Sequence, residues 1–243
     1  MKRSERHRLK ENELTHAFTE ASNRFAERQR TYGTLGAIVL VLALVGGGYW
    51  AWHTRSETRA QVMLTEALMM VQSPVEAPKP DADGKVTQLP GSYPTINARA
   101  EAALQKFMQV GDQYPSTKAG IASRYYAASA LSMLGRPGEA VTRFQDVVNR
   151  AGSSTFYGRM AQLGAIEAQV QAKQFDQAIA GAQALANSTD DSLPHDAALM
   201  ELGRAYAAAG KKAEAKQTFD KVVTEFPESA FADEAKAALA PQI

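Results

Sequence analysis

The chain of 243 residues contains no cysteine. This absence excludes disulfides, zinc sites built on thiolates, thiol catalysis and lipidation of an N-terminal cysteine. A formal net charge of +1 provides no basic field to neutralise phosphates, so nucleic-acid binding is not expected. Hydrophobic residues make up 45% and charged residues 22% of the sequence, a composition typical of folded units with a real core.

Sequence patterns that carry chemistry are also missing. The histidines lack the H-x-x-H or H-E-x-x-H spacing of a zinc site; they are His7, His16, His53 and His195. The run AAAGKK at 207–212 lacks the first glycine and the final Ser or Thr of a phosphate-binding loop. No G-x-S-x-G occurs, and the acidic pair at 190–191 falls in a polar turn. We therefore expect no catalytic residue, metal, cofactor or enzymatic activity.

The most distinctive stretch is an uncharged run of nineteen residues at 34–52. As a helix it would be about 28 Å long, close to the thickness of the hydrocarbon core of a bilayer. It has no polar stripe, which argues against a core helix of a soluble domain. The 33 residues before it and the aromatic exit Tyr49, Trp50 and Trp52 argue against a cleaved signal peptide. The sequence predicts an uncleaved transmembrane signal anchor.

The flanking charges predict the orientation of this anchor. Residues 1–33 hold eight Lys or Arg and five Glu, whereas only Arg55 and Arg59 follow within about twenty residues. The positive-inside rule then keeps residues 1–33 in the cytoplasm and places residues 53–243 in the periplasm of a diderm bacterium, with the anchor in the inner membrane.

Two features of the N-terminal part leave alternatives open. Residues 14, 18, 21 and 25 are apolar at helical spacing, which fits a helix on the inner leaflet, a helix against a partner, or a frayed solvated helix. Within the span, the glycines at 46–48 and the small pair Ala43 and Gly47 fit a flexible exit or a close contact with a second helix.

Beyond the anchor the sequence repeats with a period of 37 or 38 residues. Each repeat has an alanine followed four residues later by an apolar residue, at Ala103, Ala140, Ala178 and Ala215. Twelve residues after this alanine, a helix-breaking Pro115, Gly152 or Pro227 follows in three of the four repeats. A period of this length indicates stacked helix pairs.

The last repeat, ALMELGRAYAAAGKKAEAKQTFDKVVTEFPES at 198–229, resembles the tetratricopeptide repeat, with Leu199 in place of the usual Trp. Its small residues Gly203 and Ala215 suit two helices that cross closely. The third repeat departs most, with Ala182 where an aromatic is expected and Lys173 at the turn. The residues that define the repeats are Ala103, Phe107, Pro115, Gly135, Ala140, Phe144, Ala178, Leu202, Gly203, Tyr206, Gly210, Ala215, Phe219 and Pro227.

These repeats predict an all-α protein: one transmembrane helix, then a tetratricopeptide-like solenoid of about four helix pairs with a capping helix at 231–240. The first pair combines 57–72 with the helix that contains Ala103. Between them, 73–97 form a proline-rich insertion, which is a mobile spacer or a docking motif. Thr117 and Ser229 are expected to be N-caps.

Repeats of this type hold extended or helical peptides against an inner wall formed by the first helix of each pair. The candidate groove residues are Tyr125, Ser129, Met133, Leu163, Glu167, Met200 and Arg204. The apolar members of this set, Met133, Leu163 and Met200, equally fit packing between helices. The wall lacks the Lys and Asn of a carboxylate clamp, so recognition of C-terminal carboxylates is not expected.

The whole plan of cytoplasmic tail, anchor and repeats resembles the bacterial family of membrane-anchored ancillary subunits of the Sec translocon. The resemblance implies a chaperone-like accessory function, with translocon subunits, a membrane-anchored chaperone and secreted clients as protein partners. The alternative is a scaffold for outer-membrane or peptidoglycan assembly. Such scaffolds more often have a lipid anchor or a coiled coil, and this sequence lacks cysteine and sustained heptads.

Overall fold

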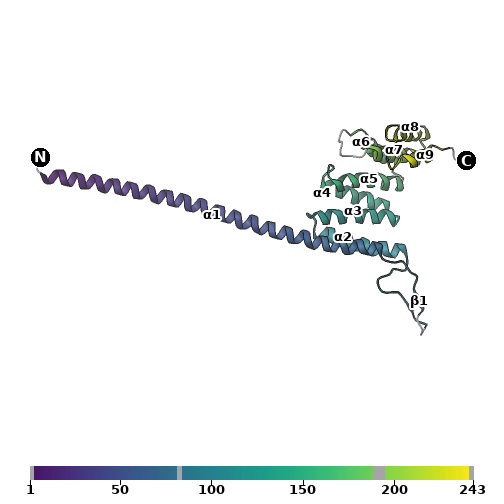
Figure 1. The fold of residues 1–243 in the computed structure, drawn as a ribbon, viewed down its shortest axis with the longest axis horizontal. Coiled ribbons are helices and arrows are strands. Elements are labelled where there is room, and N and C mark those ends of the chain that lie inside the picture. The colour runs from purple at the N-terminus through teal and green to yellow at the C-terminus, as the bar shows by residue number, and fades with distance from the viewer. Residues whose placement is uncertain (1–2, 81–83, 189–194, 241–243) are drawn as a thin grey trace. The chain divides into compact units, whose positions relative to one another are not determined.

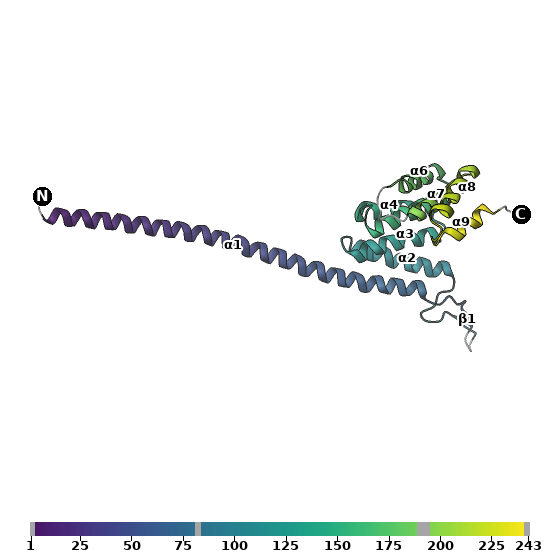
Figure 2. The same ribbon diagram turned by 45° about the horizontal axis from the view of Figure 1, so that its top comes forward.

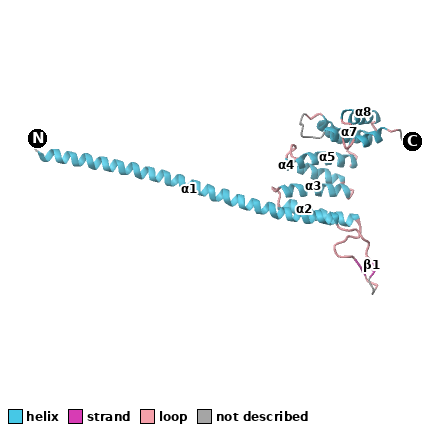
Figure 3. Cartoon of the chain, in the orientation of Figure 1, coloured by secondary structure: helices cyan, strands magenta, loops and turns pink. Residues whose placement is uncertain are grey.

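The computed structural model describes residues 3–80, 84–188 and 195–240, with side chains described at Thr19 and from residue 34 onward. The chain divides into two units, Met1–Arg55 and Ser56–Ile243. The described part is almost entirely helical, as the repeat pattern predicts (Figure 1; Figure 3). The side chains expected to form an apolar face at residues 14, 18, 21 and 25, two of the histidines and the acidic pair at 190–191 lie outside the described part.

The first unit is part of one helix, α1 (Arg3–Gln72). Within α1, Thr34–Gln72 is long and apolar enough to cross a membrane, with a window of mean hydropathy 1.8 that is not buried. Its large apolar side chains face outward, including Leu42 and Trp50 at 65% and 70% exposure. At the end of the run, the rings of Tyr49 and Trp52 lie 6.2 Å apart. The segment therefore has the length and surface of a span, as the sequence predicts.

The second unit is a stack of helix pairs, the predicted solenoid (Figure 1). The last part of α1 packs against α2 (Ile96–Gln113), since Ala60, Leu64 and Ala67 share a core with Leu104 and Phe107. The next pairs are α3 (Lys118–Met133) with α4 (Pro137–Ala151), α5 (Phe156–Gln171) with α6 (Phe175–Ala186), and α7 (His195–Ala208) with α8 (Lys212–Glu225). Helix α9 (Ala232–Leu239) follows α8 as the cap (Figure 2).

Small residues let the helices of the last pair approach. A Cβ added at Gly203 would lie 2.4 Å from Cε1 of Phe219, so only glycine fits this crossing. In the third pair, by the same spacing, the large Ile166 stands at the glycine position and Ala182 at the phenylalanine position, and both are buried. The exchange of a large for a small side chain keeps the volume of the crossing, which explains the departure of this repeat from the pattern.

The turns between paired helices share one backbone geometry. The turn residue lies in the left-handed region at Gly135, Lys173 and Gly210, with φ of 71°, 61° and 74°. In the last pair, the N–H of Lys211, the residue after the turn, donates to the Tyr206 carbonyl at 2.9 Å. This bond caps the C-terminal end of α7. Lys173 therefore adopts a conformation that favours glycine.

Threonine caps begin the first helices of two pairs. Thr117 accepts the N–H of Gly120 at 2.9 Å, as predicted, and Thr155 accepts that of Gly158 at 3.1 Å. The expected cap at Ser229 is wrong, because α9 begins at Ala232 with Phe231 in the cap position. At the Thr117 cap, a Cβ added to Gly120 would lie 1.9 Å from the Tyr114 carbonyl oxygen, so this position needs glycine. The last repeat has Ala232 at the equivalent position.

The insertion between α1 and α2 is held by its own backbone bonds. Strands β1 (Lys79–Pro80) and β2 (Val86–Thr87) pair antiparallel. At its base, the N–H of Glu76 donates to the Tyr93 carbonyl at 2.9 Å, and the N–H of Tyr93 donates to the Pro74 carbonyl at 2.9 Å. The predicted non-helical loop is therefore present in the described residues 73–80 and 84–95, with a structured base.

Candidate protein-binding surfaces

The predicted groove residues lie on the first helices of successive pairs. Tyr125, Ser129 and Met133 belong to α3, Leu163 and Glu167 to α5, and the remaining two to α7. Helix α3 contacts α5, and α5 contacts α7. These helices therefore form a continuous wall, which we call the inner wall.

An aromatic cluster occupies the inner wall between α3 and α5. The ring of Tyr125 lies 5.5 Å from Tyr126, 5.7 Å from Phe144 and 5.8 Å from Tyr157. Burial raises the pKa of the Tyr125 and Tyr157 phenols above the usual range. The cluster presents apolar ring surface with hydroxyls that can donate and accept, a combination common at protein interfaces.

Other side chains of the same two helices are exposed. Met133 is 67% exposed on α3, and Phe156 is 64% exposed on α5, where its ring meets Tyr157 at 5.2 Å. Glu167 is exposed and Leu163 is half-buried on the same helix. Phe156 was not among the predicted groove residues, although it directly follows the cap Thr155 in the first turn of α5.

Two predicted groove residues in α7 are not free to meet a ligand. Met200 is 1% exposed, because it packs with Phe219 and Val222 in the core of the last pair, so its assignment to the groove is wrong. Arg204 donates to both carboxylate oxygens of Glu234 in α9, at 2.6 and 2.7 Å, and also pairs with Glu201. Burial raises the pKa of the Glu201 carboxyl above the usual range, although Arg204 acts in the opposite direction.

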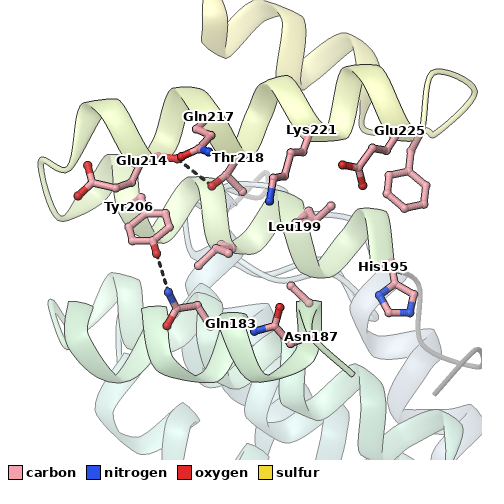
Figure 4. Close-up of a pocket in the computed structure, with 13 residues that line it drawn as sticks. Gln183, Asn187, His195, Leu199, Tyr206, Glu214, Gln217, Thr218, Lys221 and Glu225 are labelled. Carbon is pink, nitrogen blue, oxygen red and sulfur yellow. Dashed lines mark hydrogen bonds between the residues drawn. The ribbon is translucent and has the colours of Figure 1, made fainter. Parts of the chain in front are cut away.

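A second concave site, which we call the cleft, lies between α6, α7 and α8 (Figure 4). It has a volume of about 370 Å³. At one end, the Gln183 amide donates to the Tyr206 hydroxyl at 2.6 Å. Other lining residues include Asn187, His195, Leu199, Lys221 and Glu225.

One apolar residue that lines the cleft departs from the repeat pattern. Leu199 lines it and stands where the tetratricopeptide pattern usually has Trp. Polar side chains converge on it from α6 and α8, and Lys221 makes no ion pair within the described part of the protein (Figure 4). The departure at Leu199 was the only sequence signal for this site.

Nothing in the described residues gathers ligands for a metal: no group of three His, Asp or Glu side chains is close enough to hold one. His53 and His195, the described histidines, lie in α1 and α7 without a second histidine beside them. The inner wall and the cleft present aromatic, apolar and amide side chains, which are suited to binding a polypeptide.

Comparison with known proteins agrees with this architecture. Residues 197–229 match the tetratricopeptide repeat family, and no curated protein matches the sequence. Two crystal structures of kinesin light chain TPR-like repeats from Podosopora anserina, one of them a single-residue variant, are similar with TM-scores of 0.55. They are 18% and 19% identical over 75% of this protein and 84% of theirs. Identity this low shows the fold alone. The second unit is therefore a tetratricopeptide-like solenoid, an architecture that indicates a protein–protein interaction module.

Proposed function

We propose that the protein is a membrane-anchored periplasmic module that binds secreted polypeptides as a chaperone-like accessory subunit of the Sec translocon. This proposal rests on the inner wall, where the rings of Tyr125 and Tyr157 lie 5.8 Å apart and the side chains of Met133 on α3 and Phe156 on α5 are exposed. The same protein has an apolar run long enough to span a bilayer. Exposed aromatic and thioether groups adapt to many apolar sequences, as a binder of unfolded clients requires.

The partner is tested in gently solubilised membranes. Affinity-tagged full-length protein at normal expression should recover translocon subunits together with newly exported polypeptides. Recovery of neither would contradict the assignment. A matched variant, Met133→Glu, should keep the translocon subunits and lose the clients, because its charge opposes apolar segments at the inner wall while leaving the anchor unchanged.

Membrane insertion and orientation need a separate test, because a signal sequence near the N-terminus would have the same length and hydropathy as the anchor. The protein has no cysteine, so single cysteines report their own location. In intact spheroplasts, Ser4→Cys should be protected from a membrane-impermeant maleimide, and Gln217→Cys should be labelled. Labelling of both, or release of the mature protein into the soluble fraction, would contradict the proposed topology.

The scaffold alternative predicts a different behaviour. Full-length protein in lipid nanodiscs should slow the aggregation of an unfolded client if it is chaperone-like. A scaffold for envelope assembly would recover one constant set of assembly proteins and leave client aggregation unchanged.

A further inference from the structure

The cleft has an equivalent two repeats earlier in the chain, between α2, α3 and α4. The two sites use the same repeat positions, because 75 residues separate the equivalent alanines Ala140 and Ala215. The earlier site, which we call the charged groove, is lined by Asp112, Arg124, Asp146 and Arg150. In the same order, the residues at the equivalent positions of the cleft are Asn187, Leu199, Lys221 and Glu225, and all four line it. The charged groove therefore shows which contacts complete a site of this kind.

The four charges of the charged groove are paired within the chain. Arg124, whose side chain is 11% exposed, donates to Asp112 at 3.1 Å and to Asp146 at 2.9 Å. Arg150 donates to the other carboxylate oxygen of Asp146 at 2.8 Å. One carboxylate on α4 thus binds two cations, one from α3 and one from the next turn of α4.

The cleft lacks one of these charges. Lys221 stands where the charged groove has Asp146, so the charge on the second helix is inverted. Leu199 stands where Arg124 supplies the opposite charge from the first helix, and it is neutral. The side chain of Lys221 points from α8 toward α6 (Figure 4), and it forms no ion pair in the described residues. The cleft therefore has a cation without the carboxylate that would match it.

Glu225 does not supply the missing carboxylate. It follows Lys221 by four residues, and an acid after a base at this spacing pairs less favourably than an acid before a base. Asp146 and Arg150 have the favourable order and are paired. In the charged groove, Arg150 and Arg124 also bind the same carboxylate together. A like charge at the position of Glu225 is therefore compatible with a second carboxylate on Lys221.

We propose that the cleft binds an acidic segment of a partner polypeptide, with a carboxylate side chain of that segment paired to Lys221. The neutral Asn187 replaces Asp112, so an amide that can donate to a carboxylate stands where the charged groove has a second acid. Leu199 provides an apolar contact for a neighbouring side chain of the segment. Glu214, the other acidic residue of the lining, is seven residues from Lys221, or about 10 Å along α8.

The size of the cleft and its place in the protein limit what binds there. A volume of about 370 Å³ is at the small end of the range for ligand pockets, so it admits a few side chains of a peptide segment and no folded domain. None of the predicted groove residues of the inner wall lines the cleft. The inference therefore goes beyond the proposed function and does not depend on it.

Peptide binding to the full-length protein in lipid nanodiscs tests the proposal. The probe is a fluorescein-labelled, capped peptide with one Glu between two Leu in a Gly-Ser frame, measured by fluorescence anisotropy against empty nanodiscs. Its Gln counterpart should bind about tenfold more weakly, because it loses one ion pair. Lys221→Gln should weaken binding of the Glu peptide by the same factor and leave the Gln peptide unaffected. Lys216→Gln, at an exposed position on α8 outside the cleft, is the matched control and should change neither.

Every other outcome overturns the proposal. Equal affinities of the two peptides, equal losses in the two lysine variants, or no binding at millimolar peptide would each do so. Displacement of the peptide by an equal concentration of acetate would show a site for small anions. Loss of binding in Met133→Glu would place the peptide on the inner wall. Lys221→Gln should also unfold at the same urea concentration as the unmodified protein, and a lower midpoint would show that the ammonium is already paired within the chain.

Discussion

At the scale of single residues, the crossing of α7 and α8 depends on the absence of one methyl group. Gly203→Ala would place its Cβ 2.4 Å from the Phe219 ring, which must shift within a packed core. We expect a loss of about 2 kcal/mol in the free energy of unfolding, measured by urea denaturation of the full-length protein in detergent with circular dichroism. Gly138→Ala is the matched control, because a Cβ there meets nothing within 4 Å; it should be neutral or stabilising.

Lys173 gives the opposite prediction, a substitution that stabilises. Its φ of 61° costs an L-residue about 1 kcal/mol, and glycine avoids this cost. Lys173→Gly should therefore raise the free energy of unfolding by about 1 kcal/mol in the same assay. Lys173→Ala removes the same side chain and keeps the strain, so it should not stabilise. Equal effects of the two variants would show that the side chain matters and the backbone does not.

Turns and caps were predictable from the sequence where they depend on a few neighbouring residues. Gly135, Gly210 and Thr117 take the positions that their residue types favour. The prediction for Ser229 was wrong because its hydroxyl donates to Asp196 in α7 and accepts the N–H of Phe231, and α9 begins only at Ala232. The prediction for Met200 was wrong because the direction of its side chain depends on how α7 is rotated against α8. Spacing along one helix does not determine this rotation.

At the scale of secondary-structure elements, the cleft beside α7 is lined by Leu199, which is smaller than the Trp usual at its position. Leu199→Trp should fill the space and raise the free energy of unfolding by about 1 kcal/mol, measured by urea denaturation. Leu131→Trp tests the specificity of this effect, because Leu131 is 2% exposed in α3 and does not line the cleft. That variant should be destabilised by overpacking. Stabilisation by both would mean that the cleft has no particular role.

The cap helix α9 is held to the solenoid by charge as well as by Ala235. Glu234→Gln removes the paired carboxylate of Arg204 and should speed hydrogen exchange of the amides at 232–239, with little effect on α3 or α4. Asp233→Asn, on the same helix, breaks only a bond to Lys236 from a 96% exposed side chain. It should leave exchange unchanged. Faster exchange throughout the protein would contradict a local clamp.

The cap shows why part of the site was beyond sequence reasoning. The position of Arg204 on a first helix was predictable from the repeat, but its pairing with Glu234, thirty residues later, depends on how α9 folds back. The cleft depends similarly on three helices at once, with Leu199 as its single sequence signal. The helix pairs themselves were predictable, because proline and glycine end the helices or form the turns and alanine allows two helices to cross closely. Each of these effects depends on local sequence.

At the scale of the whole molecule, an anchored protein with an aromatic inner wall should contact exported polypeptides from that wall. The most direct measurement is photo-crosslinking in intact cells from a photoreactive residue at Met133, with Asp220 on α8 as the control position, both exposed. We predict adducts with newly exported polypeptides from position 133 and a marked deficit of them from position 220. Equal adducts from the two positions, or adducts from position 220 alone, would contradict the account.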